Sequence, residues 1–169
     1  HDPDTTEERY MAVIHCKTAK LFEAAAQLGA VLANRPRDTE LALGRYGLHL
    51  GTAFQLIDDV LDYRASSAEL GKNIGDDLAE GKPTLPLIHA MRHGTVEEAR
   101  IIRKAIEQGG LDQLDLVTRT IESTGALDYT ARLAVEQAER AIAELALLLG
   151  SPAKDALIDL ARFAVSRRY

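Results

Sequence analysis

Helix start and stop signals recur along almost the whole chain of 169 residues, and this punctuation limits the fold more than any other feature. Thr5 and Glu8 are spaced as a capping box for a first helix that continues to about residue 34. A cap at Asp38 starts a second helix that reaches about Tyr63. Further helices are predicted over 84–94, 95–109, 111–123 and 126–149, and from Ser151 onward. No strand-like alternation stands out, so we expect an all-α fold in a single helical domain, residues 1–169.

The composition agrees with a helical protein and excludes some classes of function. Apolar residues make up 46% of the chain and aromatic residues only 5%, a mixture that favours helix packing. Seven acids and two bases lie between Asp58 and Glu80, so one short region carries most of the net charge of −6. Nucleic acid is therefore not expected as a partner, because phosphate backbones need a basic surface.

The sequence also gives expectations about location. The single cysteine, Cys16, excludes an internal disulfide and suits a reducing compartment. No stretch approaches the roughly 20 apolar residues of a membrane-spanning helix, and no signal peptide is evident. A cytoplasmic protein is the expectation that follows.

Three glycines interrupt the second predicted helix at Gly44, Gly47 and Gly51. Glycine inside a helix costs about 1 kcal/mol relative to alanine, so a repeated glycine calls for an explanation. Close approach of a neighbouring helix or a ligand is one, and loose packing is another. The sequence leaves both open.

The same helix carries an acidic cluster near its end, at Asp58, Asp59 and Asp62, with Gln55 one turn earlier. Asp58 and Asp62 share a helix face because residues four apart are neighbours on the helix surface. Carboxylates this close repel one another, and a divalent cation removes the repulsion. Few oxygen ligands suit Mg²⁺ carried in on a phosphate. A solvated acidic helix face is the alternative reading.

Three lysines complete the candidate site, one of them next to a threonine. Lys17-Thr18 lies in a largely apolar part of the first predicted helix, where a surface lysine is the ordinary expectation. Lys72 and Lys82 belong to a glycine-punctuated loop, Gly71 to Pro86, that follows the acidic helix with room for one helical turn. Lysines among carboxylates form either ion pairs of little energetic weight or ligands for phosphate groups.

In this order, Lys17-Thr18, the acidic helix and the Gly71–Pro86 loop resemble the C-terminal half of all-trans polyprenyl diphosphate synthases. The run from Lys17 to Gly29 looks most like the medium- and long-chain members, octaprenyl diphosphate synthases above all. The resemblance extends over essentially all 169 residues. It implies the C-terminal half of the isoprenoid synthase helical bundle.

The resemblance also implies a role for each candidate residue. The aspartates at 58, 59 and 62 would form the second aspartate-rich motif of this family and hold Mg²⁺, with Asp58 as the most direct ligand. The lysines at 17, 72 and 82 would contact the allylic diphosphate. Thr18 and Gln55 would line the reacting end of the prenyl chain.

The reaction implied is a head-to-tail prenyl transfer, in which an allylic prenyl diphosphate is elongated by isopentenyl diphosphate. Negative charge develops on the leaving diphosphate, and Mg²⁺ and lysines stabilise it. A homodimer is expected for the full-length enzyme, and the long product implies transient contact with a membrane surface.

Two aspartate-rich motifs are typical of this family, and only one is found here. The groups that hold isopentenyl diphosphate in the N-terminal half are not found either. We therefore expect this chain to be a C-terminal fragment that does not turn over alone. Two other readings stay open: a related Mg²⁺-dependent terpene cyclase, and a non-catalytic helical subunit that regulates a catalytic partner.

Overall fold

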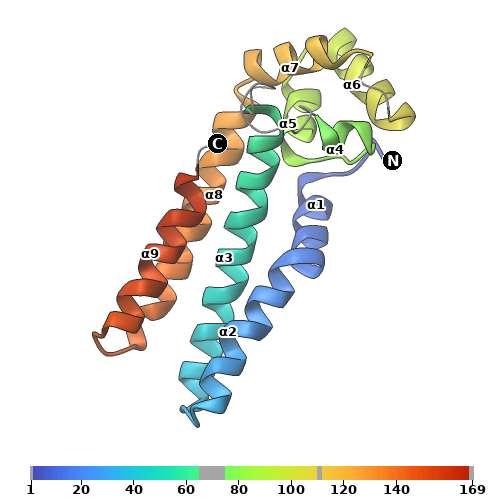
Figure 1. The fold of residues 1–169 in the computed structure, drawn as a ribbon. Helices are drawn as coiled ribbons and strands as arrows, with labels where there is room; N and C mark the ends of the chain where they lie inside the picture. Colours follow the sequence, from blue (N-terminus) through green and yellow to red (C-terminus); the bar gives the residue numbers. More distant parts are fainter. Residues whose placement is uncertain (1, 65–74, 110–111, 168–169) are drawn as a thin grey trace. The chain divides into compact units, whose positions relative to one another are not determined.

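The structure of the protein is a computed structural model that describes residues 2–64, 75–109 and 112–167. Within these ranges every regular element is a helix, which confirms the all-α prediction (Figure 1). The chain divides into two compact units. Unit 1 consists of His1–Met11, Asp58–Ala131 and Arg168–Tyr169, and unit 2 of Ala12–Ile57 and Arg132–Arg167. The expectation of a single domain stays a prediction.

The first predicted helix is present but contains an irregular turn. Helix α1 (Glu7–Ile14) leads into the π-helical turn η1 (His15–Ala19), and α2 (Lys20–Leu32) follows. In the π turn the N–H of Lys20 donates to the carbonyl of His15, five residues back. The predicted capping box is misplaced by one residue, because the hydroxyl of Thr6, not of Thr5, accepts the N–H of Arg9 at 3.3 Å. The Thr5 hydroxyl donates instead to the Asp2 carbonyl at 2.8 Å.

Helix α3 (Arg37–Arg64) is the second predicted helix, and its first residue precedes Asp38. Asp38 therefore lies in the first turn and is not the cap. The carbonyl of Pro36 accepts the N–H groups of Thr39 and Glu40 at 2.9 and 3.1 Å. An acid in the first turn is still favourable, since the N-terminus of a helix carries partial positive charge.

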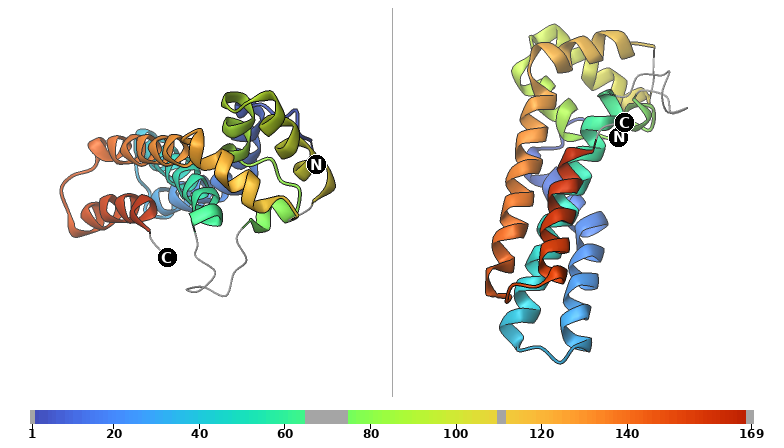
Figure 2. Two further views of the ribbon diagram at one scale, coloured as in Figure 1. Left: turned by 90° about the horizontal axis from the view of Figure 1, so that it is seen from above. Right: turned by 60° about the vertical axis from the view of Figure 1, so that its left-hand side comes forward.

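In unit 2, the part of α3 before Asp58 packs against α2, α9 (Pro152–Ser166), the short 3-10 turn η2 (Leu145–Leu147) and the part of α8 (Ala126–Glu144) that begins at Arg132. Figures 1 and 2 show these helices running alongside α3. The core gathers Tyr46 and Leu50 of α3 with small residues of α8 and α9, and the Tyr46 hydroxyl donates to the Leu157 carbonyl at 2.8 Å. None of the helices in the described ranges is long and apolar enough to cross a membrane.

Two of the three glycines in α3 are explained by the approach of α2. A Cβ at Gly47 would lie 2.3 Å from the Phe22 carbonyl oxygen, and one at Gly51 would lie 2.7 Å from the Ala19 Cα. Both distances are too short for a side chain, so close helix packing is the correct reading here. A Cβ at Gly44 would only touch Gln27 at 3.7 Å, an ordinary contact.

Unit 1 contains α4 (Asp76–Ala79), α5 (Leu85–His93), α6 (Val96–Gln108) and α7 (Leu114–Ser123) around a core of leucine, isoleucine and valine. The single helical turn expected in the glycine-punctuated loop is present as α4. The cap of α6 is a complete capping box: Thr95 Oγ1 accepts the N–H of Glu98 at 3.2 Å, and Glu98 Oε2 accepts the N–H of Thr95 at 2.7 Å.

Candidate functional site

Asp59 is the most buried of the three aspartates near the C-terminal end of α3. Its residue is 1% exposed, and its Oδ2 accepts the hydroxyl of Tyr10 from α1 at 2.5 Å. Tyr10 is itself buried. Burial first, and the negative charge of Asp59 second, hold the pKa of Tyr10 well above its usual range, so the tyrosine remains the proton donor. Asp58 and Asp62 are half-buried.

Asp62 connects α3 to the short helix α4. Its Oδ2 accepts the backbone N–H of Asp77 at 3.3 Å, and its backbone carbonyl accepts the N–H of Gly75 at 3.1 Å. Burial, and then the charge of Asp77, raise the pKa of Asp62 to about 6. The carboxylate that we predicted as a metal ligand thus also anchors the start of α4.

Lys82 lies in the same acidic region. Its Nζ is 2.9 Å from Asp77 Oδ1 and 2.6 Å from Glu80 Oε2. Hydrogen bonds to Glu80 first and to Asp77 second raise the pKa of the Lys82 ammonium. Asp77 therefore links Asp62 to Lys82 within unit 1, because its backbone N–H donates to Asp62 and its carboxylate accepts from Lys82. Lys72 lies outside the described residues.

Lys17, Thr18 and Gln55 belong to unit 2. Lys17 is exposed and Thr18 half-buried, and both lie in the π turn. The Thr18 hydroxyl donates to Gln55 Oε1 at 2.9 Å, so the structure brings these two predicted residues together. Single-turn π segments are rare and frequent at functional sites.

Phe54, the residue before Gln55, contacts Phe22 and Arg167, neither of which was predicted as a site residue. The ring of Phe54 lies 5.6 Å from the ring of Phe22, and the guanidinium of Arg167 lies 4.0 Å above it. Arg167 also donates a hydrogen bond to the Phe54 carbonyl at 3.1 Å. Tyr10 was missed as well, because no local pattern links it to a carboxylate 49 positions away. For Arg167, the only available signal was its basic character at the end of α9.

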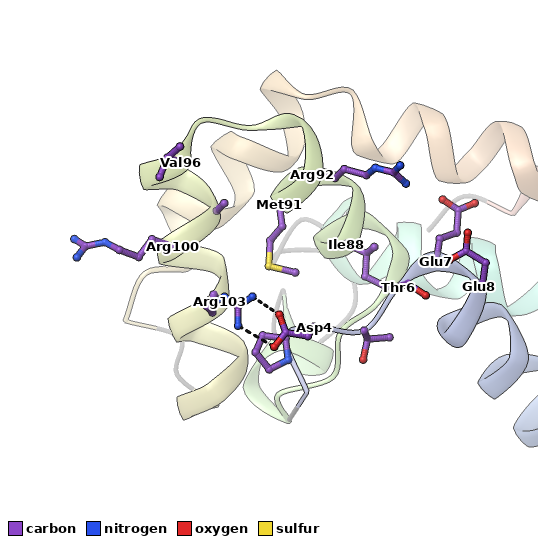
Figure 3. A pocket seen from close by; sticks show the side chains of 13 residues that line it. Asp4, Thr6, Glu7, Glu8, Ile88, Met91, Arg92, Val96, Arg100 and Arg103 are labelled. Carbon is purple, nitrogen blue, oxygen red and sulfur yellow. Dashed lines mark hydrogen bonds and ion pairs between the residues drawn. The ribbon is translucent and has the colours of Figure 1, made fainter.

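A pocket in unit 1 is lined by none of the predicted residues. Its volume is about 670 Å³, and Figure 3 shows it between the N-terminal segment and helices α5 and α6. Met91 points into it, Arg92 and Arg100 point away, and Arg103 donates two hydrogen bonds to the Asp4 carboxylate at its edge. The charges of its acidic and basic side chains largely cancel, so the pocket lacks the excess of negative charge that marks the acidic region.

The α3 carboxylates fit one kind of metal site and not another. In the described part of the chain, no three His, Cys, Asp or Glu side chains are grouped so that they could hold a metal ion. An all-protein cage is therefore not formed there. Mg²⁺ is commonly bound through one or two carboxylates, several waters and the phosphates of a substrate. Half-buried Asp58 and Asp62 fit that second kind of donor set.

Several known proteins are similar to this chain. It is 56% identical over 168 residues to octaprenyl diphosphate synthase of Escherichia coli, and 48% identical over 167 residues to an all-trans-nonaprenyl-diphosphate synthase of Rhodobacter capsulatus. These matches cover 99% of this chain and 52% and 51% of the relatives, so the chain spans about half their length. The crystal structure of polyprenyl synthase from Caulobacter crescentus, complexed with calcium and isoprenyl diphosphate, superimposes with a TM-score of 0.91. That comparison covers 100% of this chain and 52% of the other, at 43% identity.

The match to a family is independent of these single relatives. Residues 1–122, which include α1–α3, the acidic region and α4–α6, match the model of the polyprenyl synthetase family. A decaprenyl diphosphate synthase of Rhodobacter capsulatus has the same fold, with a TM-score of 0.88 at 39% identity. The resemblance inferred from the sequence motifs is thereby confirmed, and the chain belongs to the polyprenyl synthetase family.

Proposed function

We propose that this chain forms the diphosphate-holding part of a prenyltransferase that elongates an allylic prenyl diphosphate with isopentenyl diphosphate to a trans-polyprenyl diphosphate. The observation that carries the proposal is the acidic end of α3 joined to α4 and Lys82 through Asp77. Carboxylates and an ammonium group within one network suit a metal-bound diphosphate, since each charge finds an opposite partner when the ligand binds. The names of the relatives support the same substrate class.

The metal in this proposal is Mg²⁺, with Asp58 as direct ligand and Asp59 and Asp62 completing the acidic surround. When bound, the ion withdraws negative charge from the departing diphosphate. The calcium and isoprenyl diphosphate in the Caulobacter crescentus relative support divalent-metal use in the family.

The remaining predicted residues take separate roles in the proposal. Lys17, Lys72 and Lys82 contact the allylic diphosphate, and Thr18 and Gln55 line the reacting end of the prenyl chain. Lys82 is held by Glu80 and Asp77 in this structure, so a diphosphate would have to share or replace these partners. The Thr18–Gln55 hydrogen bond fixes the orientation of both side chains without a ligand.

A homodimer of the longer protein, a cytoplasmic location and transient contact with a membrane through the long product belong to the same proposal. Because the chain spans about half of its relatives, we expect no prenyl transfer from the 169 residues alone. Activity must be tested in a longer protein.

A graft tests the proposed activity. The matching segment of the Escherichia coli octaprenyl diphosphate synthase is replaced by this chain, which is 56% identical to it. The graft is then assayed with Mg²⁺, farnesyl diphosphate and isopentenyl diphosphate. We expect a linear polyprenyl diphosphate as product. In the graft, Asp58→Asn should lower kcat/KM by about 100-fold or more, because an electrostatic group at the leaving diphosphate is lost.

Asp128→Asn is the matched control, because Asp128 is exposed and forms a surface ion pair with Arg64 at 3.0 Å. It should leave kcat/KM unchanged. A folded graft without activity would contradict the proposal and favour a non-catalytic subunit. A cyclised hydrocarbon as product would favour a terpene cyclase instead.

A further inference from the structure

We infer that Tyr10 is a positioning residue for the aspartate-rich end of α3, and that Asp59 acts there through its charge and not as a ligand of the metal. The inference deepens the proposed function and rests on it. It divides the three aspartates into two roles. Asp59 is fixed inside unit 1 by Tyr10, while Asp58 and Asp62 supply the side that a metal-bound diphosphate reaches.

The contact itself is the first observation. The Tyr10 hydroxyl donates to Asp59 Oδ2 at 2.5 Å, the short distance expected for an O–H group facing an ionised carboxylate. Tyr10 and Asp59 are 5% and 1% exposed. A charge-assisted hydrogen bond between buried groups holds both side chains in one orientation, because either group would lose more when moved away from the other.

Helix geometry gives the second observation. Successive residues of an α-helix are turned by about 100°, so Asp58 and Asp59 point in different directions and Asp62 lies between them. Asp59 reaches Tyr10 of α1. Asp62 reaches the backbone N–H of Asp77 in α4. The three carboxylates therefore do not converge on one point, which agrees with the lack of a three-ligand group in the described ranges.

The third observation is that the three aspartates differ in how far a hydrated metal ion can reach them. Mg²⁺ bound to a diphosphate keeps several waters and needs a ligand that faces solvent. The 1% exposure of Asp59 leaves no room for a hydrated ion. Asp59 would have to break its bond to Tyr10 and leave the interior before it could bind the metal. Asp58 and Asp62 are half-buried, so part of each residue already faces solvent.

The consequence concerns the orientation of α3. Tyr10 connects α1 to the turn of α3 that carries all three aspartates, so the hydroxyl limits how that turn can rotate or shift. Groups in direct contact with a metal ligand typically contribute about 10- to 100-fold to metal affinity. Tyr10 contacts Asp59, the neighbour of the proposed ligand Asp58, so we expect an effect at the lower end of this range. Loss of the hydroxyl should therefore weaken metal binding although no ligand is removed.

Binding of Mn²⁺ to the 169-residue chain in the presence of inorganic diphosphate, followed by electron paramagnetic resonance, tests the inference. We expect Tyr10→Phe to weaken Mn²⁺ binding by about 10-fold. Asp59→Asn keeps an oxygen that can accept the Tyr10 hydroxyl, so it should weaken binding less than Asp58→Asn. In the double variant Tyr10→Phe/Asp59→Asn, the fold-loss should be smaller than the product of the two single losses, because Asp59→Asn has already weakened the charge-assisted hydrogen bond that Tyr10→Phe removes.

Tyr129→Phe is the matched control. Its hydroxyl also donates to a carboxylate of unit 1, but the acceptor is Glu7 at 3.0 Å, which is not one of the aspartates of α3, so Mn²⁺ affinity should not change. All measurements are made well below the thermal unfolding midpoint of each variant, so that partial unfolding does not lower the apparent affinity.

The outcomes separate the two claims. If the unaltered chain binds Mn²⁺ and Tyr10→Phe binds as tightly as Tyr129→Phe, Tyr10 does not position the site and the inference is wrong. If Asp59→Asn loses as much affinity as Asp58→Asn, Asp59 is a ligand and the inference is again wrong. Failure of the unaltered chain to bind Mn²⁺ with diphosphate would instead overturn the proposed metal site, and the role of Tyr10 with it.

Discussion

At the scale of single residues, the aspartates of α3 differ far more in the structure than in the sequence. The spacing of Asp58, Asp59 and Asp62 predicted one acidic group on one helix, and the structure has it there. The direction of each side chain depends on partners that lie elsewhere in the chain, Tyr10 for Asp59 and Asp77 for Asp62. Such partners cannot be read from local spacing, which fixes the helix face but not what packs against it.

Asp62 predicts a specific dependence of stability on pH. Its pKa is about 6 in the folded chain, above the ordinary value of 3.8, so the folded state binds the proton more tightly than the unfolded state. The stabilisation is fully present below the ordinary value and is lost as the pH rises through 6. Asp62→Asn removes this titration but keeps an acceptor for the Asp77 N–H.

We therefore expect the free energy of unfolding of the unaltered chain to fall, relative to that of Asp62→Asn, between about pH 4 and pH 6. Urea unfolding of both proteins at several pH values measures the difference. Carboxyl groups that do not interact with Asp62 titrate equally in the two proteins, so their contributions cancel. A difference that stays constant with pH, or grows as the pH rises, would show that the pKa of Asp62 is not raised.

At the scale of helices, the sequence predicted which segments are helical better than how the helices begin. A helix cap depends on a single hydrogen bond, and neighbouring residues can compete to form it. At the start of α1 the cap is Thr6 and not Thr5. At the start of α3 the Pro36 carbonyl accepts the first N–H groups, although Asp38 was predicted as the cap. The π turn was not predicted, because the periodicity of apolar residues is too coarse to reveal one additional residue in one turn. The sequence left open why glycines recur in α3, and the close packing of α2 explains Gly47 and Gly51.

The glycine contact gives a prediction for this pair of helices. In Gly47→Ala, the new methyl group would meet the backbone oxygen of Phe22 at 2.3 Å, and backbone cannot move aside as a flexible side chain can. We expect the free energy of unfolding to fall by about 1–3 kcal/mol, the usual cost of overpacking. Thermal and urea unfolding measure it.

Gly29→Ala is the control, because Gly29 lies in α2 and no atom of the described residues comes within 4 Å of the place that its new methyl group would take. Here the helix propensity of alanine should act alone and stabilise the chain by up to about 1 kcal/mol. Opposite signs for the two substitutions are the expected result. Equal effects would mean that α2 does not approach α3 as closely as described.

At the scale of the whole molecule, large apolar side chains of unit 2 remain on the surface. On α2, Leu21, Leu28 and Leu32 are 75%, 54% and 75% exposed, and on α9 Phe163 is 62% exposed. Leu21, Leu28 and Leu32 lie seven and four residues apart, so they share one face of α2. An exposed apolar face is uncommon on a stable monomer and favours association or binding of apolar molecules. The exposure of these side chains could not be predicted from the sequence, because apolar residues that recur at helical spacing are ordinarily assigned to the core.

The exposed leucines predict the behaviour of the purified chain. We expect it to bind an apolar fluorescent dye and to associate further as its concentration rises. Leu21→Lys/Leu32→Lys should reduce both effects, as measured by dye fluorescence and by sedimentation. Val96→Lys is the control, since Val96 is 89% exposed but belongs to α6 in unit 1 and not to α2. A dye response unchanged by the double substitution would exclude α2 as the surface responsible.

The π turn at His15–Ala19 has a consequence for which changes of length the first helix can accept. A π turn holds one residue more than a regular α-helical turn, so removing one residue there would restore regular winding without a break in the backbone. The side chains of α2 would keep nearly their present directions, because the wider turn already absorbs the additional residue. Removing Leu21 from the regular part of α2 would instead turn the side chains on one side of the deletion by about 100° relative to those on the other. Ala19 and Phe22 could then not both keep their places against Gly51 and Gly47. The first helix can therefore lose a residue in the π turn, but not in the turn that follows it.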